Sequence, residues 1–177
     1  MLVMTTPSQR PAAGEYNTYY ATYTKLVPDG EILQTLQSQH QVLQAAVGGV
    51  GEAKANARPA AGEWSIKEVI GHLIDSERLF GFRAMWFARG ETAALPGMEP
   101  NPWVTHANFN TRSLSDLLDE FEHVRDASRL FFEGLDAAAW ARTGSASGFP
   151  VSVRALAWII AGHELHHFAS LREKYLP

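Results

Sequence analysis

The chain has 177 residues, of which 46% are apolar and 19% charged, and this composition predicts a single domain with a sizeable core. Fifteen Lys and Arg residues against 19 Asp and Glu give a net charge of −4 without a basic block, so electrostatics gives no support for nucleic-acid binding. The chain has no cysteine, which excludes disulfides, thiolate metal ligands and a cysteine nucleophile. Any thiol chemistry must therefore take its sulfur from a substrate.

We expect residues 1–15 to form a flexible tail, because they carry two prolines and a glycine, and we expect the domain over residues 16–177. Four tyrosines follow the tail at spacings of three and four, which predicts a short segment that packs its rings onto the main body: Tyr16, Tyr19, Tyr20 and Tyr23. The first residues are too few for a signal-peptide core, and the best apolar run, residues 155–161, is far shorter than the roughly 20 residues of a membrane span. We therefore expect a cytoplasmic protein with no membrane partner.

Four segments then carry the apolar periodicity of amphipathic helices. In chain order they cover residues 29–47, 65–90, 113–131 and 152–175. The second segment begins with Ser65-Ile66-Lys67-Glu68, which matches a capping box. No strand pattern or Asn-Gly hairpin competes with this interpretation. The sequence predicts an all-α four-helix bundle with long connections at 91–112 and 135–151, and the first is long enough for a crossover or a lid.

Three histidines lie in apolar stretches of the second and fourth segments. His163 and His167 are one helical turn apart on one face, so both imidazoles can converge on one metal ion. His72 lies near the start of its helix, as His167 lies near the end of its own, so antiparallel helices would bring all three to one height. Buried histidines need partners, and one shared metal ion would satisfy all three. The alternative is that each histidine finds its own carboxylate or carbonyl.

Two carboxylates lie next to these histidines in the sequence and are candidate catalytic groups. Asp75 follows His72 by one turn and is placed to orient a histidine ring, and Glu164 directly follows His163. The alternative for both is a solvated carboxylate. Residues 163–167 also match the metalloprotease pattern H-E-x-x-H, but no histidine follows to supply the third ligand, so we do not favour a protease.

Residues 64–78, residues 87–97 and residues 152–167 together resemble the DinB/YfiT-like superfamily, and the similarity covers about residues 16–176. The resemblance implies a bundle of up-down-down-up order, with a long crossover loop between its second and third helices. It also implies a metal triad at His72, His163 and His167, and a homodimer. Family members are described as metal-dependent hydrolases or as thiol S-transferases. The family does not fix the substrate.

We therefore predict a metal-dependent enzyme that transfers a small-molecule thiol to an electrophile held under the 91–112 loop, where Trp103 and Phe109 offer apolar contacts. A hydrolase that uses metal-activated hydroxide at the same site is one alternative. A non-enzymatic, metal-binding stress-response module is another. Three imidazoles suit several divalent ions, and we expect zinc first and nickel second, with iron, copper or manganese as further candidates.

Overall fold

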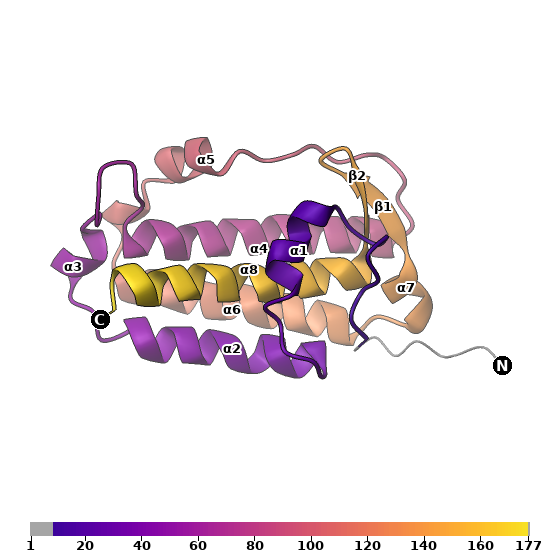
Figure 1. Cartoon of the computed structure of the whole chain (residues 1–177), viewed down its shortest axis with the longest axis horizontal. Coiled ribbons are helices and arrows are strands. Elements are labelled where there is room, and N and C mark those ends of the chain that lie inside the picture. The colour runs from indigo at the N-terminus through magenta and orange to yellow at the C-terminus, as the bar shows by residue number, and fades with distance from the viewer. Residues whose placement is uncertain (1–8, 177) are drawn as a thin grey trace.

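Four long helices lie side by side and form the body of the molecule, which the computed structural model describes over residues 9–176 (Figure 1). In chain order they are α2 (Ile32–Val47), α4 (Ile66–Ala88), α6 (Leu114–Glu133) and α8 (Val153–Lys174). Helices α2 and α4 each pack against both α6 and α8. Helices α2 and α8 run in one direction, and α4 and α6 run in the other (Figure 1). The predicted four-helix bundle with up-down-down-up order is thereby confirmed.

Serine caps define the start of three of these four helices. The Ser65 hydroxyl accepts a hydrogen bond from the Glu68 backbone N–H at 3.1 Å, and the Glu68 carboxylate accepts one from the Ser65 backbone N–H at 2.8 Å. This is the predicted capping box, with both halves present. Ser113 and Ser152 also accept hydrogen bonds from the backbone N–H three residues further on. Each cap fixes where its helix begins, and so fixes the height of the side chains that follow.

A buried ion-pair cluster joins all four helices at mid-height of the bundle. Arg125 on α6 binds both carboxylate oxygens of Glu77 on α4 at 2.8 Å, and binds Glu164 on α8 at 2.7 Å. The same guanidinium donates to the backbone carbonyl of Leu36 on α2 at 3.1 Å, and Gln39 donates to Glu164 at 2.5 Å. Apolar clusters lie on either side of this layer. The layer therefore ties all four helices together between the two apolar clusters.

The long connections contain more secondary structure than the sequence analysis expected. The crossover between α4 and α6 carries α5 (Pro100–Ala107) and the short 3-10 helix η2 (Phe109–Thr111). Figure 1 shows this crossover returning along the outside of α4. A five-residue helix, α3 (Glu52–Asn56), also lies between α2 and α4.

The expectation of a connecting loop without strands at 135–151 was wrong. That segment contains α7 (Ala137–Ala141) and an antiparallel hairpin of β1 (Thr143–Ala146) and β2 (Phe149–Ser152). Ser147 and Gly148 form its turn, both with positive φ, 55° and 82°. Serine adopts this conformation less readily than asparagine, so the turn lacks the Asn-Gly signal by which a hairpin is recognised. Leu95 of the crossover adds a bridge to Ala146 of β1.

The described part of the N-terminal segment is held against the bundle, which differs from the expectation of a flexible tail over residues 1–15. Arg10 donates to the backbone carbonyls of Thr24 and Val27, both at 2.7 Å, and its guanidinium lies 4.5 Å from the centre of the Trp158 ring. Glu15 forms an ion pair with Arg154. Residues 1–8 lie outside the described residues. The chain continues through η1 (Thr18–Tyr20) and α1 (Ala21–Thr24), which cross α8 (Figure 1).

None of the helices between residues 9 and 176 combines the length and the apolar character that a membrane span would require.

Candidate metal centre

Helices α4 and α8 bring His72, His163 and His167 together. The Nε2 atom of His163 lies 3.1 Å from the Nε2 atom of His72, and 3.1 Å from that of His167. One ligand nitrogen from each of the three rings lies within 4.8 Å of the others. Because α4 and α8 run antiparallel (Figure 1), the two helices present these side chains at one height, as the sequence analysis expected.

The donor set of this cluster fits a divalent metal ion. Three nitrogen ligands at about 2.0–2.1 Å from a tetrahedral ion lie about 3.3 Å from one another, close to the two 3.1 Å separations from His163. All three ligand atoms are neutral imidazole nitrogens, which zinc binds well. A tetrahedral ion held by three side chains keeps a fourth position for a small molecule.

Burial keeps these histidines uncharged. Desolvation lowers the pKa of His72 from 6.5 to about 4, and lowers that of His167 to about 3 with help from neighbouring histidines. The pKa of His163 is also well below 6.5, mainly because of burial and then because of the other rings nearby. Metal binding requires the deprotonated imidazole, so the site is in its binding form near neutral pH.

The two predicted catalytic carboxylates lie outside this cluster, and their catalytic roles stay predictions. Glu164 points into the buried layer, where Arg125 and Gln39 bind one of its oxygens. Asp75 is half-buried with Arg78 as its nearest cation, 4.0 Å away, and burial raises its pKa. The group that approaches His72 is instead Ser76, whose Oγ lies 3.4 Å from Nδ1 and 3.5 Å from Nε2 of the ring. This hydroxyl is placed to orient the ring.

Aromatic rings that the sequence analysis did not assign to the site surround the cluster. The Trp64 ring lies 4.8 Å from the His72 ring and stacks on His167 at 6.3 Å, between ring centres. The Tyr23 ring meets the His163 ring edge to face at 5.3 Å. The three-and-four spacing of the tyrosines predicted packing onto the body, but gave no sign of which surface they cover. The rings restrict the imidazoles to orientations that converge.

Helices α4 and α8 each have a glycine directly before their first histidine of the cluster. At each glycine, another segment of the chain packs closely against the helix. A Cβ atom at Gly71 would lie 2.3 Å from the Phe109 ring of the crossover. A Cβ atom at Gly162 would lie 2.3 Å from the backbone oxygen of Tyr23. Phe109, expected to contact substrate, is therefore buried against α4, whereas Trp103 of the same crossover is 43% exposed. The two glycines let covering segments lie directly on the ligand-bearing helices.

Two pockets with room for a small molecule reach the histidines by separate routes and share no lining residue. An aromatic pocket reaches His72 and His163, and the other residues that line it are Tyr19, Tyr20, Tyr23, Ser76, Phe80, Met98 and Pro100. A polar pocket reaches His167, and the other residues that line it are Gly62, Glu63, Trp64, Val69, Asn101, His166, Ser170, Lys174 and Tyr175. The crossover contributes to both pockets, so it covers the site as the sequence analysis allowed.

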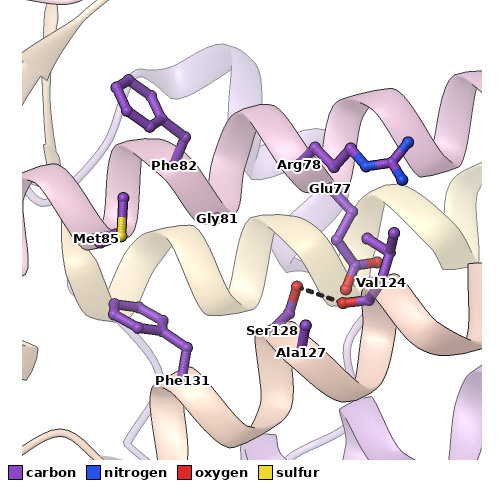
Figure 2. Close-up of a pocket in the computed structure, with 9 residues that line it drawn as sticks. All are labelled: Glu77, Arg78, Gly81, Phe82, Met85, Val124, Ala127, Ser128 and Phe131. Carbon is purple, nitrogen blue, oxygen red and sulfur yellow. Dashed lines mark hydrogen bonds between the residues drawn. The ribbon is translucent and has the colours of Figure 1, made fainter.

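A third pocket lies between α4 and α6 and contains none of the three histidines (Figure 2). Phe82 and Met85 of α4 and Phe131 of α6 form its apolar walls. The Ser128 hydroxyl donates to the Val124 carbonyl of its own helix at 3.0 Å, which leaves little polar surface in the groove. This pocket therefore offers apolar contact without the chemistry of the histidine cluster.

Comparison with known proteins gives three kinds of similarity. The family model described as DinB superfamily matches residues 35–171. A Geobacillus thermodenitrificans protein, described as an inferred metal-dependent hydrolase, is 26% identical over 147 residues, which cover 80% of each chain. Among solved structures, YfiT from Bacillus subtilis, described as an inferred metal-dependent hydrolase of unusual four-helix bundle topology, has a TM-score of 0.73 at 19% identity over 80% of this chain and 82% of its own.

A second solved structure, the mycothiol-dependent maleylpyruvate isomerase, has a TM-score of 0.67 at 16% identity and covers 84% of this chain and 62% of its own. At these identities, the two structures show that the fold is shared.

Proposed function

Because the chain belongs to the DinB superfamily, we propose that it is a metal-dependent enzyme that transfers a low-molecular-weight thiol to an electrophilic substrate. The observation that carries the proposal is the convergence of three neutral imidazoles beside two separate pockets. The descriptions of the relatives support metal dependence, and the mycothiol-dependent isomerase supports the use of a thiol by this fold. A reaction between two substrates needs two places beside the reactive centre, and the two pockets supply them.

In this proposal His72, His163 and His167 hold a divalent ion, with zinc as the first candidate. When bound, such an ion lowers the pKa of a coordinated thiol or water and so makes it a better nucleophile. The side chains around the histidines fix their geometry. Ser76 orients the His72 ring, while Trp64 and Tyr23 pack against the imidazoles. The protein itself supplies no thiol, because the chain has no cysteine.

Hydrolysis at the same site is the second candidate, and the descriptions of two relatives favour it. A hydrolase commonly uses a carboxylate or histidine base to remove a proton from water. The nearest carboxylate in the sequence, Glu164, is already bound by Arg125 and Gln39. A thiol is more acidic than water and depends less on such a base, so we place transfer before hydrolysis.

Elemental analysis of protein purified without a histidine tag, followed by assays with glutathione, mycothiol and bacillithiol against 1-chloro-2,4-dinitrobenzene, tests these alternatives. We expect bound metal and thiol consumption that is lost in His72→Asn and His163→Asn. Turnover of ester substrates without any thiol would support the hydrolase instead. Bound metal without either reaction would support the non-enzymatic module. The homodimer implied by the resemblance stays a prediction, which light scattering would test.

A further inference from the structure

We propose that Tyr19, Tyr20 and Tyr23 form the binding site for the electrophile, and that this site selects a small, planar molecule with an acceptor oxygen. This inference rests on the proposed function and names the substrate class of the same centre. The three tyrosines line the aromatic pocket together with His72 and His163. A molecule in this pocket would therefore lie beside the two most buried histidines of the cluster.

The rings of this pocket form a continuous series of edge-to-face contacts. Tyr19 meets Tyr20 at 5.6 Å and Tyr23 at 5.7 Å, and Tyr20 meets Phe80 at 6.1 Å. Tyr23 and Phe80 in turn meet the His163 ring at 5.3 and 5.9 Å. Aromatic rings interact favourably with further ring edges and faces at such separations. A planar apolar molecule can extend this series, whereas a puckered molecule of the same size loses the ring–ring contacts.

A pair of hydroxyl groups gives the pocket its polar contact. The Tyr19 and Tyr23 oxygens lie 3.0 Å apart, so one of the two hydroxyls donates its proton to the other. The hydroxyl that accepts still has its own proton to donate. Tyr23 is 9% exposed, whereas Tyr19 is 61% exposed, so the pair extends from the buried cluster to the solvent. An acceptor oxygen on the ligand can take the remaining proton.

The polar pocket completes the assignment of the two substrates. Glu63 and Lys174 form an ion pair of 2.7 Å at its rim, and Asn101 contributes an amide. Charged and amide groups suit the polar carrier of a low-molecular-weight thiol better than a planar apolar molecule. The thiol therefore belongs on the His167 side, and the electrophile on the tyrosine side.

The groove between α4 and α6 is the main competing site for a planar apolar molecule (Figure 2). It offers Phe82, Met85 and Phe131 without the hydroxyl pair of the tyrosines. Substitution of Phe82, which is 43% exposed and remote from the histidine cluster, gives a matched control.

Two matched ketones test the proposal by titration calorimetry of the full chain, with and without zinc. Acetophenone has a planar ring and one acceptor oxygen, whereas cyclohexyl methyl ketone has the same oxygen on a puckered ring. We expect Tyr23→Phe to lower the affinity for both ketones by about three- to tenfold, because it removes a hydroxyl of the hydrogen-bonding pair. Tyr20→Leu should lower the affinity for acetophenone by about three- to tenfold and leave the affinity for the saturated ketone nearly unchanged. Phe82→Ala should change neither affinity.

The proposal is overturned if the two tyrosine variants bind both ketones like the parent protein, or if Phe82→Ala abolishes the binding. Equal affinity of the parent protein for the two ketones would overturn the selection for planarity. Zinc titrations of the same variants separate this result from the proposed function. Tyr20→Leu should bind zinc like the parent protein. If the parent protein bound no zinc, the proposed function would fail, while the ketone titrations would still decide the role of the tyrosines.

Discussion

His163 and Glu164 are neighbours on α8, yet their side chains belong to two buried polar clusters of opposite character. In the ion-pair cluster, Arg125 is paired with both Glu77 and Glu164, so each charge has a partner. In the histidine cluster, the Nε2 atom of His163 faces those of His72 and His167 at 3.1 Å, without a carboxylate among the three rings. The carboxylates of the first cluster already share a cation, whereas the second cluster is suited to an additional cation. Adjacent residues can therefore serve stability and function separately.

Of the changes considered, removal of Arg125 should lower the free energy of unfolding most, because it leaves two carboxylates buried without a cation. We expect Arg125→Met to lower the free energy of unfolding by about 3–5 kcal/mol. Arg78→Met is the matched control, since Arg78 is 52% exposed and pairs with Glu120 at 2.6 Å near the surface. Arg78→Met should lower the free energy of unfolding by less than about 1 kcal/mol. Equal losses in urea unfolding of the two variants would show that the buried cluster is not a structural centre.

Acidification should destabilise the metal-free protein through the histidine cluster. The pKa of His72 is lowered from 6.5 to about 4 by burial, so between these pH values the unfolded state binds a proton that the folded state does not. The free energy of unfolding should therefore fall as the pH drops through this window, by about 3 kcal/mol for His72 alone. His163 and His167 act in the same direction.

Urea unfolding across this pH range measures the loss. In His72→Phe the slope should be smaller, whereas Phe82→Ala, which removes no titratable group, should keep the slope of the parent protein. A stability that does not change with pH in this window would contradict the assignment of neutral, buried imidazoles.

Zinc should stabilise the histidine cluster and leave the ion-pair cluster unaffected. At a free zinc concentration of 100 times Kd, the expected gain is about 2.7 kcal/mol, seen as a rise in Tm. His163→Asn should abolish the gain, whereas Arg78→Met should retain it. An equal rise in Tm for His163→Asn would place the zinc elsewhere on the protein.

The smallest effect is expected from the group that orients a ligand. Ser76→Ala removes the hydroxyl 3.4 Å from His72 Nδ1 and should lower the affinity for zinc by about tenfold or less. Competition with a chromophoric chelator measures the change. A substitution at Ser128, which bonds its own helix in the α4–α6 groove, provides the comparison and should leave the zinc affinity unchanged.

The sequence predicted the parts of this fold that depend on local, periodic signals. The capping box at Ser65 and the serines at 113 and 152 define helix starts, and the i,i+4 spacing of His163 and His167 places two rings on one face. Together with the antiparallel helices, this was enough to bring His72 to the same height.

The contacts that depend on distant segments could not be predicted in this way. Arg125 lies on the apolar face of its own helix, four residues after Phe121, but its spacing does not show which carboxylates it meets, because Glu77 and Glu164 belong to other helices. Tyr23 reaches His163 because α1 crosses α8, which the tyrosine spacing does not encode. The Ser147-Gly148 turn is a weak hairpin signal, so β1 and β2 were also missed.

The glycines at positions 71 and 162 are two places where a substitution would move a segment that covers the histidine cluster. A methyl group added at position 162 would displace the tyrosine segment from α8, and one added at position 71 would displace Phe109 of the crossover from α4. Neither change touches an imidazole. Protein engineers could thus move the tyrosine pocket alone through position 162, whereas position 71 would move the crossover that lines both pockets.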